Sequence, residues 1–187
     1  MSQLIQSKII NLPLPEQGSA SYVYILCFVA ALGGLLFGFD TAIINGALKY
    51  TIDHFGLDAK VQVNLIGLLV SCAILGCIPG SMAAGPLSDR FGPKRILIMA
   101  AVFYLISALG AAFPGRLSGF IVYRFLGGLG VGAASMLSPL YIAEVSPAHI
   151  RGRLVSLNQL AIISGILLAF VASFFFKDLA ENWRWMF

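Results

Sequence analysis

Five long apolar segments alternate with short polar ones along the chain. They lie near residues 22–47, 61–84, 96–113, 119–143 and 154–176. Each is close to the roughly 20 residues that a helix needs to cross about 30 Å of hydrocarbon. The pattern predicts an all-α membrane protein with about five transmembrane helices. Because the connections are short, we expect one bundle over residues 22–187, preceded by a tail over residues 1–21.

The composition indicates that lipid surrounds most of the chain. Hydrophobic residues make up 59% of the sequence and charged residues only 11%, whereas soluble domains average about 25% charged residues. The net charge of +4 is spread over scattered Lys and Arg residues, which argues against nucleic acid as a partner. The three cysteines lie in apolar segments and the two histidines are isolated, so we expect no metal site. No catalytic grouping or phosphate-binding loop is recognisable, so we expect neither an enzyme nor a cofactor.

Two charged residues lie inside the apolar segments. Asp40 is the only acid in the first segment, and Arg124 opens the fourth. A charge at the centre of a membrane helix costs about 2.5–3.5 kcal/mol on insertion scales, so it normally faces the protein interior and has a partner. At about 1.5 Å per residue, Asp40 lies roughly 27 Å along an outward helix and Arg124 roughly 8 Å along an inward one. Both fall in the outer half of the membrane, where they can pair.

Glycines four residues apart recur in three of the segments. They are Gly34 with Gly38, Gly76 with Gly80, and Gly128 with Gly132. Since lipid supplies no hydrophobic drive for helix association, small residues at this spacing let helix backbones approach closely. The pattern predicts tightly packed helices around the charged pair.

Several runs of residues resemble one known family. They are RFLGGLGVG at residues 124–132 and PLYIAEVSPAHIRG at residues 139–152, together with FGFD, GPLSDRFGPKR and WRWMF. These runs are similar to the signatures of sugar porters in the major facilitator superfamily, and the resemblance covers nearly the whole chain. It implies a twelve-helix fold in two halves, of which this chain would be most of the N-terminal half. The C-terminal half would then be a missing partner.

The resemblance also implies roles for residues inside the membrane. An acid at the position of Asp40 is similar to proton-coupled sugar symporters, so Asp40 and Arg124 would be the proton-coupling pair. A static ion pair that only fixes helix packing is the alternative. Phe37, Gln159, Ile162 and Ile163 would bind the sugar, which we expect to be a monosaccharide. For Gln159, a hydrogen bond between two helices is the alternative.

Two charged clusters resemble the cytoplasmic gate of the family. One is the Gly85–Arg95 loop with Asp89 and Arg90, in which glycines at 85 and 92 permit tight turns. The other comprises Glu144, Arg151 and Arg153. Here the alternative is a solvated surface whose salt bridges contribute little.

The basic residues of these two clusters predict the orientation. They are densely grouped, whereas basic residues in the other loops are single, so we expect the clusters and the N-terminus on the cytoplasmic side. The short loops favour a bacterial inner membrane. The sequence thus predicts secondary active sugar transport by alternating access, most similar to proton symport. A facilitative sugar or polyol uniporter and a non-transporting fragment that associates with a full-length carrier are the alternatives.

Overall fold

The computed structural model describes residues 20–57, 61–113, 115–176, 184 and 186. Five helices make up the described chain: α2 (Ala20–His54), α3 (Val63–Phe91), α4 (Pro93–Ala112), α5 (Leu117–Val145) and α6 (Arg151–Phe176). All five are long and apolar enough to cross a membrane. The prediction of an all-α membrane fold with about five spans is confirmed. The tail expected over residues 1–21 lies outside the described residues, apart from its last two, which already belong to α2.

The helices extend beyond the apolar segments that predicted them. α2 continues to His54 and α3 to Phe91, because a helix does not end where its side chains become polar. The Gly85–Arg95 segment is therefore not the loop that we expected. Within it, only Gly92 lies outside a helix, with a φ of 85° that suits glycine. Gly85 is helical, so the tight turn expected there is wrong.

Three prolines lie in α3 and at the start of α4. Pro79 and Pro86 lie inside α3, where each removes a backbone hydrogen bond that neighbouring groups in a membrane bundle can replace. Pro93 begins α4, and a proline is favoured at this first position because its N–H has no intrahelical partner there. α3 and α4 therefore form a hairpin that turns within one residue.

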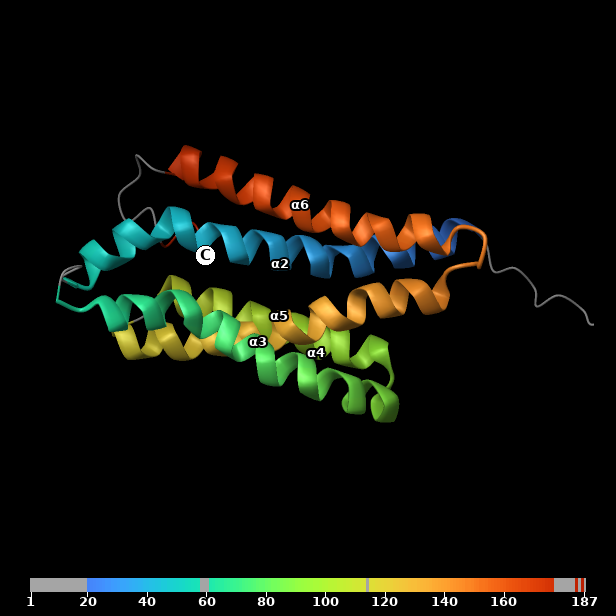
Figure 1. Ribbon diagram of the computed structural model, residues 1–187, viewed down its shortest axis with the longest axis horizontal. Helices are drawn as coiled ribbons and strands as arrows, with labels where there is room; N and C mark the ends of the chain where they lie inside the picture. Colours follow the sequence, from blue (N-terminus) through green and yellow to red (C-terminus); the bar gives the residue numbers. More distant parts are fainter. Residues whose placement is uncertain (1–19, 58–60, 114, 177–183, 185, 187) are drawn as a thin grey trace, which may run out of the picture.

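The first close helix pair joins α2 to α6, which run side by side along one layer in Figure 1. A Cβ atom added at Gly38 would lie 2.0 Å from the backbone oxygen of Ile162, and one at Gly165 would lie 2.1 Å from that of Leu35. Real Cβ atoms do not approach so closely, so only glycine allows this contact. The two helices touch backbone to backbone.

The second close pair joins α3 to α5 in the same manner. A Cβ atom at Gly76 would lie 2.3 Å from the backbone oxygen of Phe125, and one at Gly132 would lie 2.3 Å from that of Cys77. α4 packs along the other side of α5. The glycine spacing therefore predicted the contacts correctly, and α5 is the helix that links the α3/α4 hairpin to α2.

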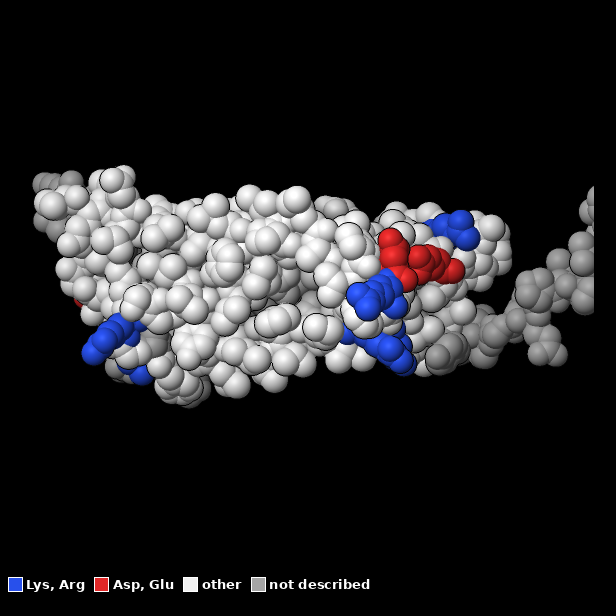
Figure 2. Space-filling view, turned by 90° about the horizontal axis from the view of Figure 1, so that it is seen from below, with Lys and Arg blue, Asp and Glu red and all other residues white. Residues whose placement is uncertain are grey.

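The outer surface is apolar along most of its length. Large exposed hydrophobic side chains occur on every helix, among them Phe28, Met82, Leu109, Val122 and Phe175. Figure 2 shows Lys, Arg, Asp and Glu only near the two ends of the visible face. The mixed cluster of both signs lies at the end where α3 and α5 finish and α4 and α6 begin. This distribution fits a bundle whose middle is surrounded by lipid.

Candidate functional site

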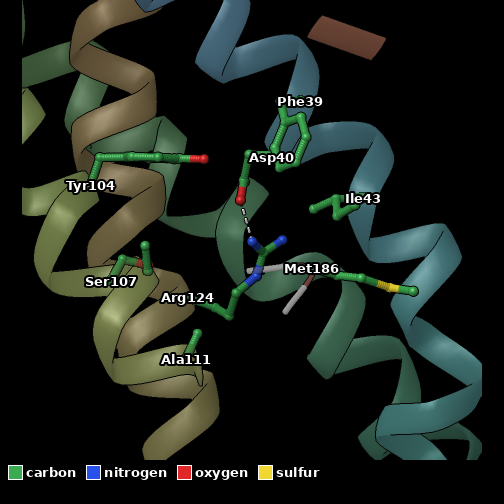
Figure 3. A pocket seen from close by; sticks show the side chains of 9 residues that line it. Phe39, Asp40, Ile43, Tyr104, Ser107, Ala111, Arg124 and Met186 are labelled. Atoms are coloured by element: carbon green, nitrogen blue, oxygen red, sulfur yellow. Dashed lines mark hydrogen bonds and ion pairs between the residues drawn. The ribbon is translucent and has the colours of Figure 1, made fainter. Parts of the chain in front are cut away.

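An ion pair between Asp40 and Arg124 lies inside the bundle. Asp40 projects from α2 and Arg124 from α5, and the Arg124 Nη1 donates a hydrogen bond to the Asp40 Oδ1 (Figure 3). The side chains are 14% and 4% exposed, respectively. The pairing expected from the sequence is therefore present in the structure. Whether it couples protons to transport is a separate question of function.

The local sequence explains how the arginine reaches this position. Gly127 and Gly128 follow Arg124 on α5, and both are buried. A Cβ atom at Gly127 would meet the Ser107 Oγ of α4 at 2.3 Å, and one at Gly128 would meet the Ala73 oxygen of α3 at 2.1 Å. Because these glycines have no side chain, α3 and α4 pack closely against α5 about one helical turn after Arg124. The charge is thereby held away from lipid and toward α2.

A small cavity adjoins the ion pair. Its volume is about 10 Å³, and α2, α4, α5 and Met186 all contribute to its wall. Besides the ion pair, the polar groups of this wall are Tyr104 and Ser107, both on α4. Figure 3 shows the Tyr104 hydroxyl pointing across toward Asp40. The sequence singled out neither residue, because which face of α4 meets Asp40 depends on how three helices pack.

The predicted sugar-binding residues lie along the contact between α2 and α6. Phe37 neighbours Gly38, where an added Cβ atom would clash with the backbone of Ile162. Phe37 and Ile162 are partly buried, whereas Gln159 and Ile163 are exposed. Neither this small cavity nor the larger groove described below includes any of these four residues. All four belong to the α2/α6 pair, outside these two cavities.

Gln159 does not form the helix-to-helix hydrogen bond that was its alternative. Its side chain is exposed and makes no hydrogen bond within the described part of the chain. The buried amide of α6 is instead its neighbour Asn158, which is 7% exposed and packs against Gly34 of α2. A sequence pattern could not separate these adjacent amides, because a rotation of 100° per residue decides which one faces α2.

A larger groove of about 490 Å³ runs between α2, α4 and α5. Its wall is mostly apolar. The polar side chains of this wall are Lys94, Tyr104, Ser138 and Tyr141. Ser138 is fully buried, and its hydroxyl oxygen has no hydrogen-bond partner among the described residues. No residue predicted from the sequence to bind substrate lies here.

The predicted gate residues gather at one end of the bundle. Asp89 and Arg90 lie in the last turn of α3, Glu144 near the end of α5, and Arg151 and Arg153 at the start of α6; all five are exposed. Arg151 Nη2 donates a long hydrogen bond of 3.5 Å to the Ser146 oxygen. The Arg90 guanidinium carbon lies 5.4 Å from the centroid of the Phe91 ring. No ion pair joins the five residues in the part of the chain that the structure describes.

Comparisons with known proteins point in one direction. Residues 26–187 match the family described as "Sugar (and other) transporter". The chain is 48% identical to the glucose transport protein of Synechocystis sp., with 92% of this chain and 39% of that protein covered. It is 41% identical to the D-xylose-proton symporter of Escherichia coli K12, with 91% and 41% covered.

The fold leads to the same relatives. The solved structure of the proton:xylose symporter XylE, bound to 6-bromo-6-deoxy-D-glucose, matches with a TM-score of 0.85 at 40% identity. The match covers 90% of this chain and 42% of the symporter. The chain therefore spans about two fifths of the length of the relatives that it matches.

Proposed function

Because the chain belongs to the sugar transporter family of the major facilitator superfamily, we propose that it forms the N-terminal bundle of a proton-coupled sugar carrier. In such a carrier, two bundles rock against each other around a site at their interface. This bundle would supply one wall of that site and the proton-coupling group. The relatives that it matches are transporters rather than enzymes, and the carrier would perform no covalent chemistry.

The observation that carries this proposal is the ion pair between Asp40 and Arg124. An arginine cannot lose its proton in a protein, so only the aspartate of this pair can change charge. While Asp40 is charged, it holds α2 to α5 through Arg124. When Asp40 takes up a proton, the ionic part of this contact is lost, and the two helices can separate more easily. Protonation thereby favours one arrangement of the bundle over another.

The sugar would bind on the face that carries Phe37, Gln159, Ile162 and Ile163. An exposed amide such as Gln159 can donate and accept hydrogen bonds with hydroxyl groups at once. Phe37 would offer an apolar surface to the C–H groups of a pyranose ring. Neither of the two cavities of the bundle includes this face, which fits a site whose second wall comes from another bundle. A monosaccharide is the substrate class that fits.

The charged end would act as the cytoplasmic gate. Asp89, Arg90, Glu144, Arg151 and Arg153 are exposed and have no ion-pair partner among the described residues. They are therefore available to pair with charges on a second bundle when the carrier closes on this side. In this orientation the N-terminus lies in the cytoplasm, and a bacterial inner membrane is the site of action.

The test removes the titratable group and keeps its shape. Residues 1–187 are joined to the part of the E. coli D-xylose-proton symporter that follows its matched region, so that the sixth helix of the first half and the whole C-terminal bundle are present, and the carrier is reconstituted in vesicles. With Asp40→Asn, we expect sugar accumulation driven by a proton gradient to be lost, because the cycle no longer depends on protonation. Equilibrium sugar exchange should survive, since the sugar-binding face is unchanged. Radiolabelled sugar uptake with and without a gradient measures both activities.

The controls separate coupling from folding. Asp40→Glu keeps a titratable group and should retain part of the accumulation. Residues 1–187 alone should accumulate no sugar. An Asp40→Asn carrier that still concentrates sugar with the original pH dependence would remove Asp40 from the mechanism. An unaltered carrier that equilibrates sugar but never concentrates it would identify the uniporter alternative.

A further inference from the structure

The small cavity beside the ion pair has the size and the lining of a water site. Its volume of about 10 Å³ is close to the space that one water molecule needs. Oxygen or nitrogen atoms reach it from three helices: Asp40 from α2, Tyr104 and Ser107 from α4, and Arg124 from α5. Buried waters typically make about three hydrogen bonds to polar groups, whereas apolar cavities of this kind stay dry.

The Tyr104 hydroxyl is one of the groups that a molecule in this cavity would join. It points toward the Asp40 carboxylate from the opposite side of the cavity (Figure 3), and no direct hydrogen bond joins the two side chains. Tyr104 is partly buried within the apolar span of α4, where a hydroxyl without a hydrogen-bond partner costs free energy. A bridging molecule satisfies the hydroxyl and the carboxylate together.

We propose that this cavity binds one ordered water molecule, which links the Tyr104 hydroxyl to the Asp40 carboxylate, with Ser107 as a further partner. A water molecule suits this place because it can both donate and accept hydrogen bonds. It donates to Asp40 when the carboxylate is charged and accepts from it when the carboxyl group is protonated. Tyr104 is then a positioning residue that acts on Asp40 through the water.

The importance of this water for coupling rests on the proposed function, although its binding does not. In a coupled carrier, Asp40 has to exist in two protonation states within lipid. A partner that can reverse its hydrogen bond stabilises both states, which Arg124 cannot do because it only donates. When the contact between Asp40 and Arg124 breaks, the water would still provide a hydrogen bond to the Asp40 carboxyl group.

Met186 makes the water site measurable. Its side chain lines the cavity and is only 2% exposed. X-ray irradiation of water produces hydroxyl radicals, which oxidise a neighbouring methionine to its sulfoxide. In lipid nanodiscs, a water in the cavity should therefore oxidise Met186 faster than Met82, which is 73% exposed on the apolar surface of α3. Mass spectrometry of the 187-residue chain measures both rates.

The decisive variant is Tyr104→Phe, which keeps the ring and removes the hydroxyl. We expect the oxidation rate of Met186 to fall several-fold, because the water loses one of its partners. Tyr123→Phe is the matched control: this tyrosine packs its ring against Gly110 of α4 and does not line the cavity, so the Met186 rate should stay unchanged. Ser107→Ala should lower the rate in the same direction and replaces Tyr104→Phe if that variant misfolds.

Two results would overturn the proposal. In one, Met186 is oxidised no faster than Met82 in the unaltered chain, which means that the cavity is dry. In the other, the rate is the same with and without the Tyr104 hydroxyl, which means that the radicals come from bulk water. Neither result bears on the proposed function, since the measurement involves no sugar and no proton gradient.

Discussion

Two groups of charged residues in the bundle have opposite environments. Inside the bundle, Asp40 and Arg124 are nearly buried and joined to each other. At the end where α3 and α5 finish, Asp89, Glu144 and Arg153 are exposed and unpaired within the described part of the chain. Removing one partner of a buried pair costs about 3–5 kcal/mol, whereas an exposed pair contributes about 0–1 kcal/mol. The same residue types therefore hold the fold together in one region and leave it almost unaffected in the other.

The largest effect is expected from breaking the buried pair on one side only. Asp40→Leu should lower the free energy of unfolding by about 3–5 kcal/mol, because the permanent charge of Arg124 loses this carboxylate. Arg124→Leu should cost less, since an aspartate can take up a proton and become neutral whereas an arginine cannot. Unfolding in mixed micelles with increasing denaturing detergent, followed by circular dichroism, measures both.

The double variant Asp40→Leu with Arg124→Leu is the control for this prediction. It removes both charges of the buried pair, so it should be more stable than Asp40→Leu alone. If the two single effects simply add in the double variant, the residues do not interact, and the contrast between the two regions disappears.

A smaller effect is expected at the exposed end. Glu144→Gln and Arg153→Gln should each change the free energy of unfolding by less than about 1 kcal/mol. In the joined carrier, the same variants should alter the rate of sugar transport, because they remove charges that a second bundle would contact. The same unfolding assay measures the change in stability, and an uptake assay measures the rate of sugar transport. A large loss of stability with normal transport would assign these residues to the fold instead of the gate.

The smallest effect on the protein is expected from a test of which side this end faces. Single cysteines replace His149 at this end and Asp53 at the other in a chain without its three native cysteines; both positions are exposed. In intact cells, an impermeant thiol reagent should label position 53 and leave position 149 unlabelled, with no change in stability. The reverse pattern would invert the proposed orientation.

The sequence predicted those features that depend on one helix at a time or on the cost of charge in lipid. The five spans follow from segment length, and the partnership of Asp40 with Arg124 follows because each is expensive alone. Glycines at a spacing of four likewise predicted where the helix backbones touch. These constraints are strong enough to be read without coordinates.

Features that depend on helix rotation or on helix ends were not predictable in the same way. The Gly85–Arg95 segment was expected to be a loop because the hydropathy pattern marks the edge of the hydrocarbon, which is not the end of a helix. Tyr104 and Ser107 lie among the apolar residues of α4, and only the packing of α4 against α5 turns them toward Asp40. The sugar-binding residues remain a prediction, since their site needs a second wall.

The separation of Asp40 and Arg124 along the chain has a consequence during synthesis. The two residues are 84 positions apart, and a ribosome adds roughly 5–20 residues per second, so Asp40 is made about 4–17 seconds before Arg124. α2 therefore enters the membrane with an acidic side chain whose partner does not yet exist. Its glycine contacts with α6 form later still, because α6 begins at Arg151. Among the described helices, α2 is thus made first, but its packing contacts are completed last, because they come from helices that the ribosome makes later.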